Sequence, residues 1–360
     1  MTGTVLALAG GVGGAKLVLG LARVLGAGEL VVVGNTGDDF SHLGLAISPD
    51  LDTLLYTLAG LADPSRGWGR ENETWKFMEA LEQLGGPTWF RLGDADLALH
   101  VERTRQLAAG EKLSAVTDRL RKQLGVATRI LPMTDDPVRT RLRTSHGWLD
   151  FQDYFVRLRC EPVVQELNYV GAEAARPLPE VLDLLADEKL RAVVICPSNP
   201  FLSIEPILAI PGVRAAIAAC RAPVVGLSPI IAGQAVKGPT AKMMKELGIE
   251  AKAEAVARRY ADLLDMFFVD QADAAAVLPD GVERVLEQTL MITLADRERL
   301  ALAVLAELAV ADRHHGTPLR LLLGGVRQQN AAGGHFFGVE DLEDDAVVDW
   351  LEVELAHVGS

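Results

Sequence analysis

The stretch TVLALAGGVGGAKLVLGLARVL, residues 4–25, contains the pattern that decides the fold. It begins with a short aliphatic run that ends at Gly10, which predicts a buried strand. The segment GGVGGAK follows, and the leucines and valines after it recur at helical spacing. A strand, a glycine-rich turn and a helix in this order can bind an anion, because exposed amides and the helix dipole both attract negative charge.

The residue pattern of this glycine loop excludes two common nucleotide-binding motifs. A Walker loop has serine or threonine after its lysine, whereas Leu17 follows Lys16. A strict GxGxxG motif that starts at Gly11 would need its last glycine where Lys16 stands. We therefore expect a phosphate or nucleotide loop of another type, formed by Gly11, Gly13, Gly14 and Lys16. The alternative is a glycine turn that only allows the strand and the helix to pack closely.

Apolar runs alternate with helical patterns over most of the chain. Such alternation predicts an α/β fold, Rossmann-like, with a three-layer parallel sheet whose carboxyl edge collects ligand. We expect the core from residues 1–60 and 171–310, with a mixed α+β insertion over 61–170 that includes a hairpin within 138–151. An acidic extension is expected over 311–360, where Glu340 to Glu354 carries eight acids and no base. The runs expected as strands include 30–34, 192–198, 222–229, 266–269 and 290–294.

Composition excludes several classes of function. Across 360 residues, 35 Lys and Arg stand against 49 Asp and Glu, a net charge of −14. This balance argues against non-specific nucleic-acid binding, which requires a basic face. No stretch approaches the roughly 20 apolar residues that span a bilayer. The three cysteines (Cys160, Cys196 and Cys220) are widely spaced, which favours a reduced, cytoplasmic protein without a membrane segment.

A second informative stretch is GNTGDDFSHLGLAISPDLDTLLYTL, residues 34–58. Its aspartates lie between a predicted strand and a predicted helix, and carboxylate oxygens in such a place suit a divalent cation such as Mg²⁺. Asp50 and Asp52 can converge on one face of an extended or capping segment, although on a helix they would diverge. Asp50 can instead be the N-cap of a helix that begins at Leu51. Asp38 and Asp39 can be turn residues only.

Several segments together resemble one family, the CofD/FbiA transferases of deazaflavin coenzyme F-420 synthesis. The resemblance runs in the family's order over residues 1–309 and is closest to the bacterial, FbiA-like branch. One departure is GDADLALH, where the family commonly has GDRDLATH, so Ala95 and Leu99 lack the usual side chains. The matching segments are GGVGGAK (10–16), GDD (37–39), SPDLDTLLYTL (48–58), DPSRGWG (63–69), ETW (73–75), WFRLGDADLALH (89–100), LPMTDDPV (131–138), FQDYFVR (151–157), PSNP (197–200) and SPIIAG (228–233).

The resemblance implies a reaction and a set of site residues. The terminal ribityl hydroxyl of the deazaflavin Fo attacks the phosphate that carries a phospholactyl or phosphoenolpyruvyl group in its guanosine diphosphate ester, and GMP leaves. Magnesium assists, and the protein is a homodimer. Asp50 and Asp52 are expected to be catalytic and to bind the metal. The residues expected to bind substrate are Gly11, Gly13, Gly14, Lys16, Asn35, Arg91, Asp94, Asp96, His100, Ser198, Asn199 and Ser228.

Each of these assignments has a plainer alternative. Ser198, Asn199 and Ser228 follow predicted strands and can meet guanine or phosphate, or can belong to ordinary turns. His100 can be a structural hydrogen-bonding residue rather than a base. Asp94 and Asp96 can orient the deazaflavin or the metal, or do neither.

Two other functions compete with transfer. A YvcK-like nucleotide-sugar-binding regulator resembles CofD in fold, but such proteins lack SPDLDT, DPSRGWG and FQDYF. A nicotinamide-dependent oxidoreductase needs a GxGxxG loop, and an acid at the end of the second strand. Here the motif fails and Asp38 lies four residues beyond Gly34.

Overall fold

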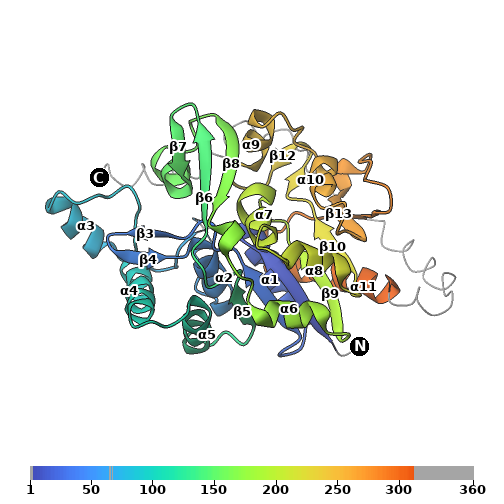
Figure 1. Ribbon diagram of the computed structural model, residues 1–360, viewed down its shortest axis with the longest axis horizontal. Coiled ribbons are helices and arrows are strands. Elements are labelled where there is room, and N and C mark those ends of the chain that lie inside the picture. Colours follow the sequence, from blue (N-terminus) through green and yellow to red (C-terminus); the bar gives the residue numbers. More distant parts are fainter. Residues whose placement is uncertain (1–2, 65, 67, 312–360) are drawn as a thin grey trace.

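The computed structural model describes residues 3–64, 66 and 68–311, and a seven-stranded parallel sheet forms its centre (Figure 1). The strand order is β14-β13-β10-β9-β1-β2-β5. Buried aliphatic runs form the middle strands, as expected for a parallel sheet that is covered on both faces. The strands are β1 (Thr4–Ala9), β2 (Leu30–Gly34), β5 (Arg129–Pro132), β9 (Leu190–Ile195), β10 (Val224–Leu227), β13 (Met266–Asp270) and β14 (Glu283–Glu287).

Helices cover both faces of this sheet. Successive residues of β1 point to opposite faces, so Val5 and Ala7 lie in one apolar core and Leu6 and Leu8 in another. The first core contains side chains of α1 (Gly11–Val24), α2 (Pro49–Ala59), α5 (Leu113–Gln123) and α11 (Leu294–Ala311). The second contains side chains of α6 (Pro179–Ala186), α7 (Glu205–Leu208), α8 (Val213–Ala219), α9 (Thr240–Glu246) and α10 (Ala253–Arg259). The expected three-layer α/β fold is confirmed.

The middle of the chain builds smaller elements beside the sheet. The expected hairpin is present as β6 (Arg139–Thr144) and β7 (Gly147–Asp150), and β8 (Val164–Val170) extends it to three antiparallel strands. β5 lies within the range expected for the insertion, yet it pairs with β2 at the edge of the main sheet. The other elements here are β3 (Phe40–His42), β4 (Leu45–Ile47), α3 (Lys76–Gln83) and α4 (Asp94–Ala108).

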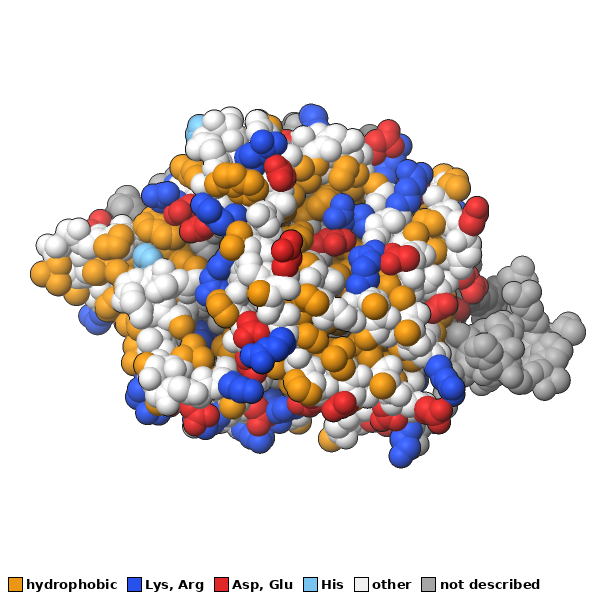
Figure 2. All heavy atoms as spheres, in the orientation of Figure 1, with side chains coloured by type: hydrophobic (Ala, Val, Ile, Leu, Met, Phe, Trp, Pro, Cys, Tyr) orange, Lys and Arg blue, Asp and Glu red, His pale blue; other side chains and the backbone are white. Residues whose placement is uncertain are grey.

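The predicted strand over residues 290–294 is wrong. The last strand of the sheet is β14, a mostly exposed edge strand with charged residues at both ends, and α11 begins at Leu294. The acidic extension over 312–360 lies outside the described residues. On the face in Figure 2, basic side chains are interspersed with acidic ones rather than gathered in a stripe. No single helix among the described residues is long and apolar enough to cross a membrane.

The order of the strands places a crevice above the middle of the sheet. β1 lies between β2 and β9, and the chain continues from β2 toward one edge and from β9 toward the other. Open α/β sheets bind ligands outside the carboxyl ends of the strands at such a switch point. The loops that follow β1 and β9 meet here, since Ser198 Oγ donates to the Gly10 carbonyl at 2.8 Å and accepts from the Gly10 amide at 3.2 Å.

Gly20 allows α1 to pack closely against α11. A Cβ atom at Gly20 would clash with the carbonyl oxygen of Arg297, which is backbone and cannot rotate away. We expect Gly20→Ala to lower the free energy of unfolding by about 1–2 kcal/mol, because overpacking outweighs the gain in helix propensity. Urea unfolding measures this, with Gly26→Ala as the control, since a Cβ there faces only the flexible Glu29 side chain. Equal stability of the two variants would contradict the packing argument.

Candidate functional site

A pocket of about 330 Å³ opens at the switch point. The loops after β1, β9 and β10 form part of its wall, and the first turn of α2, α4 and residues 151–160 contribute further parts. It therefore brings together most of the residues singled out from the sequence. Those that line it are Gly11, Gly13, Lys16, Asp50, Asp52, Arg91, Asp96, His100, Ser198, Asn199 and Ser228; Gly14, Asn35 and Asp94 do not.

The glycine loop packs tightly against the loop that follows β9. A Cβ atom at Gly13 would lie 2.5 Å from the Pro197 carbonyl oxygen, and one at Gly14 would clash with Ser198 Oγ. Gly11 has φ +61, in the left-handed region that favours glycine. Close packing thus accounts for Gly13 and Gly14, and Gly13 also faces the pocket.

Asp50 ties this loop to the end of β2. Its Oδ1 accepts a hydrogen bond from the Gly11 amide at 2.6 Å, and its Oδ2 accepts one from Asn35 Nδ2 at 2.9 Å. Asn35 is fully buried and also donates to Asp38 Oδ1 and to the Leu202 carbonyl. Asn35 therefore lies beneath the pocket floor and positions the two carboxylates that face the cavity.

The surroundings of Asp38 and Asp50 disfavour the ionised form of both carboxyl groups. Burial, followed by the charge of Asp50, raises the pKa of Asp38 well above its usual range. Burial raises the pKa of Asp50 to about 6, although the hydrogen bonds from Asn35 and Gly11 oppose the shift. Two buried acids that disfavour each other's ionised form are chemically suited to share a cation.

The donor set fits magnesium in one particular mode. No group of three or more His, Cys, Asp or Glu able to hold a metal occurs among the residues that the structure describes. Mg²⁺ is commonly held by one or two carboxylates together with substrate phosphates and waters. Asp38 and Asp50 match this mode, because both are carboxylates and both line the pocket.

Asp52 has different partners from Asp50. Helix α2 begins at Pro49 with Ser48 as its N-cap residue, so both aspartates lie in its first turn. Residues two apart on a helix point about 200° apart, and Asp52 consequently meets Arg103 of α4 instead of Asp50. The sequence-based alternative of a helix that begins at Leu51 with Asp50 as its cap is therefore wrong.

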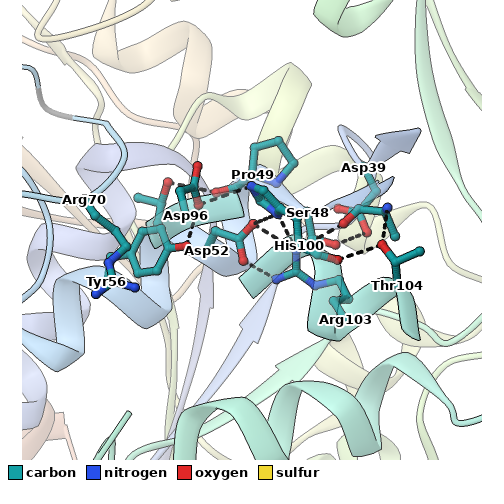
Figure 3. A network of polar contacts seen from close by, with 12 residues as sticks. Asp39, Ser48, Pro49, Asp52, Tyr56, Arg70, Asp96, His100, Arg103 and Thr104 are labelled. Carbon is teal, nitrogen blue, oxygen red and sulfur yellow. Dashed lines mark hydrogen bonds and ion pairs between the residues drawn. The ribbon is translucent and has the colours of Figure 1, made fainter. Parts of the chain in front are cut away.

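A buried polar network extends from Asp52 along α4 (Figure 3). Both carboxylate oxygens of Asp52 accept hydrogen bonds from the Arg103 guanidinium, with Nη1–Oδ2 at 3.0 Å. The same Nη1 lies 3.2 Å from His100 Nδ1, and His100 Nε2 lies 3.2 Å from Asp96 Oδ1. Tyr56 donates its hydroxyl hydrogen to Asp96 Oδ1 at 2.5 Å. Four of these five side chains line the pocket, and Arg103 is the one behind them.

Asp39 lies beside this network but is not among the residues that line the pocket. Its Oδ2 accepts a hydrogen bond from Ser48 Oγ at 2.8 Å, while its buried Oδ1 has no partner among the described residues. Burial raises the pKa of Asp39 to about 8. Asp39 is thus more than a solvated turn residue.

The remaining predicted residues have individual surroundings. Lys16 Nζ donates to the Met291 carbonyl at 2.8 Å, and burial followed by the charges of Arg297 and Lys237 lowers the pKa of Lys16. The Arg91 guanidinium lies 4.4 Å from the centre of the Trp75 ring.

Asp94 and Asn199 each accept hydrogen bonds from backbone amides at the start of a helix. Asp94 accepts hydrogen bonds from the amides of Lys76 and Phe77, so it stabilises the start of α3, away from the cavity. Asn199 Oδ1 accepts from the amides of Phe201 and Leu202, and its buried Nδ2 has no partner among the described residues.

Two pairs of aromatic side chains that the sequence analysis did not single out also line the pocket, and together they are called its aromatic wall. Trp89 and Phe90 pack edge to face with a centroid distance of 5.8 Å, and both contact His42. Phe151 and Phe155 stack at 5.3 Å. The available signal was the concentration of aromatic residues in the segments WFRLGD and FQDYFVR. The pocket residues not predicted include Tyr56, Trp68, Trp89, Phe90, Phe151, Phe155 and Lys237.

The fold and the pocket define a Rossmann-like α/β protein whose ligand site lies above the central strands of its sheet. The model of the family described as 2-phospho-L-lactate transferase CofD matches residues 5–309. The chain belongs to the CofD family, and the expected membership is confirmed.

Relatives with similar sequences carry a narrower name. The chain is 42% identical to "Phosphoenolpyruvate transferase" of Kitasatospora aureofaciens over 321 residues, covering 87% of this chain and 99% of the relative. It is 40% identical to the protein of that name in Mycolicibacterium smegmatis over 329 residues, covering 84% and 97%. Among solved structures, protein BH3568 from Bacillus halodurans superposes with a TM-score of 0.55 at 16% identity, covering 85% of this chain and 100% of that one. This last similarity shows the fold alone.

The buried pair Asp52–Arg103 yields a stability prediction. Asp52→Asn leaves a buried guanidinium without its full partner, and we expect the free energy of unfolding to fall by about 3–5 kcal/mol. The double variant Asp52→Leu with Arg103→Met removes both charges and should recover most of this loss. Urea unfolding of the single and double variants measures the difference. If Asp52→Asn were as stable as the unmodified protein, the ion pair would not hold α2 and α4 together.

Proposed function

We propose that this protein transfers a phosphoenolpyruvyl or phospholactyl group from its guanosine diphosphate ester to the ribityl hydroxyl of Fo, releasing GMP. The observation that carries the proposal is the composition of the pocket in a CofD-family chain. Buried carboxylates lie beside a glycine loop in one part of it, and aromatic rings line another. A diphosphate ester and a planar heterocycle need these two environments respectively. The name of the relatives favours the phosphoenolpyruvyl donor.

The donor end is assigned to the part of the pocket around the N-terminus of α1. Lys16 and Lys237 supply positive charge there, and the amides and dipole of the helix start favour a phosphate. The unpartnered Nδ2 of Asn199 is a donor that a guanine or phosphate oxygen would satisfy. These groups would hold the diphosphate and leave the phosphate to be attacked facing the carboxylates.

The acceptor end is assigned to the aromatic wall. Trp89, Phe90 and Phe151 present ring faces and edges to the cavity, and a deazaflavin ring can pack on them. Trp68 and Arg91 also line the cavity and come from the inserted region of the chain. A nucleotide-sugar-binding regulator would need no such surface for a tricyclic ring.

Magnesium is the metal that this proposal includes, with Asp38 and Asp50 as the residues that would hold it. Bound there, it would neutralise charge on the diphosphate during transfer. The protein's own groups would orient the ester, keep the ring of the acceptor against the aromatic wall and exclude water from the reacting phosphate. The resemblance also implies a homodimer in the cytoplasm, which stays part of the proposal.

The direct test supplies Fo, Mg²⁺ and the guanylyl ester of phosphoenolpyruvate or phospholactate. We expect GMP and an acidic deazaflavin product to form in equal amounts. Chromatography with absorbance detection measures both products. Omission of Fo should abolish GMP release, which separates transfer from hydrolysis. The absence of product with either donor, together with tight binding of a UDP-sugar, would reject the transferase and favour the regulator.

A second test addresses the metal. Removal of magnesium by EDTA should abolish turnover, and added Mg²⁺ should restore it. Asp50→Asn should lower kcat at least about 100-fold and raise the Mg²⁺ concentration needed for half-maximal rate, because one carboxylate of the site is lost. Asp150→Asn is the matched control, since this side chain is 68% exposed on β7 and paired with Arg141. Full activity in EDTA would exclude the magnesium assignment.

A further inference from the structure

The network in Figure 3 gives its carboxylates unequal chemical roles. Asp52 and Asp96 both line the pocket, and both are candidates to receive a proton from an attacking hydroxyl. Their hydrogen-bond partners differ, and these partners come from α2 and α4. The difference decides which of the two carboxylates is open to the pocket.

Both oxygens of Asp52 are already hydrogen-bonded to Arg103. The guanidinium of Arg103, which is 1% exposed, bonds to both of its oxygens in the fork geometry that arginine and carboxylate adopt. The positive charge of Arg103 is permanent, so Arg103 is a standing countercharge for the Asp52 carboxylate. Asp52 is accordingly a structural partner for Arg103.

Arg103 also fixes the tautomer of His100. A guanidinium has only donors, so at 3.2 Å from Arg103 Nη1 the His100 Nδ1 must accept. The single imidazole proton then lies on Nε2, which is 3.2 Å from Asp96 Oδ1 and donates to it. With Nδ1 engaged and Nε2 protonated, His100 has no lone pair for a substrate hydroxyl. His100 is a hydrogen-bond donor in this network.

Asp96 is the carboxylate left with a free oxygen. Its Oδ1 takes the hydrogen bonds from Tyr56 and His100, and Oδ2 takes none from the described residues. Its side chain is 13% exposed, and the residue lines the pocket. Burial acts to raise the pKa of Asp96, but the hydrogen bonds from His100 and Tyr56 and the charge of Arg103 outweigh it and lower the pKa.

The surroundings of Asp96 favour the ionised carboxylate as well. It lies in the first turn of α4, where the helix dipole stabilises negative charge. Arg70 lies over the Tyr56 ring at 5.6 Å and donates to the Ala95 carbonyl at 3.4 Å. Glu73 is the opposing charge nearby, and its oxygens accept the amides of Ala95 and Asp96 at 2.8 Å.

We propose that Asp96 accepts the proton of the attacking hydroxyl, and that Arg103 is a positioning residue that acts through His100. The inference rests on the proposed transfer. The hydroxyl oxygen forms its bond to the phosphate bearing the three-carbon group, and its proton passes to Asp96 Oδ2. The bond from that phosphate to the GMP oxygen breaks, and the electron pair leaves with GMP. The proton then returns to water as product departs.

Kinetics of two variants test the carboxylate. Asp96→Asn should lower kcat by about 10²–10⁴-fold while the KM for the acceptor changes little. Tyr56→Phe removes a hydrogen bond to the ionised carboxylate, so the acid limb of the kcat–pH profile should move to higher pH. Glu102→Gln, an exposed carboxylate on the same helix, is the control and should match the unmodified enzyme. An active Asp96→Asn variant would overturn the assignment while the transferase function stands.

Nitrogen-15 NMR of the histidine side chains tests Arg103 without any substrate. The His100 resonances, assigned by their loss in His100→Gln, should show Nδ1 unprotonated and Nε2 protonated in the resting protein. Arg103→Lys keeps a cation for Asp52 but loses the fork, and it should abolish this single tautomer and lower kcat. A protonated Nδ1 in the unmodified protein would overturn the role of Arg103. A protein with the expected tautomer that makes no product would instead refute the proposed function.

Discussion

The hydrogen bonds of the Asp50 carboxylate constrain the whole site. One oxygen accepts a hydrogen bond from the Gly11 amide at the start of α1, and the other accepts one from the side chain of Asn35, which follows β2. One residue of α2 therefore joins the carboxyl ends of two neighbouring strands. These bonds fix the first loop, the second loop and the first turn of α2 relative to each other. The burial of this carboxyl group is unfavourable for its ionised form, because it raises the pKa of Asp50 to about 6. The pocket floor is therefore held by hydrogen bonds and electrostatically unsatisfied at the same point.

Helix α2 divides the pocket because of its own periodicity. Asp50 points to the glycine loop and the neighbouring Asp38, whose ionised form is disfavoured by burial and by the charge of Asp50. Asp52, two residues on, points to α4 and is neutralised by Arg103. The proposed cation region and the proposed proton-accepting region thus lie on opposite sides of one helical turn. The spacing of two residues would bring the carboxylates together only on a segment without helical geometry.

Short-range patterns in the sequence predict the fold well. Buried aliphatic runs identify β1, β2, β9, β10 and β13, because a strand covered on both faces is apolar along its length. β14 is not predicted because it is an edge strand with three charged residues in five, whereas the apolar run at 290–294 has the pattern of a buried strand. The site is less predictable. Arg103 lies 51 residues from Asp52, and its sequence context is that of an ordinary exposed helix position. Only the fold reveals that it is buried.

The energetic cost of this site argues for chemistry over binding alone. Asp38, Asp39, Asp50, Asp52 and Arg103 are each at most 7% exposed, and two of the carboxyl groups stay without a countercharge among the described residues. A site that only held a nucleotide sugar would gain affinity from neutral donors and shape without burying these charges. A site that moves a phosphate needs charge placed in advance where charge develops during the reaction. Strongly perturbed acids at a switch point of a parallel sheet are the expected consequence of that requirement.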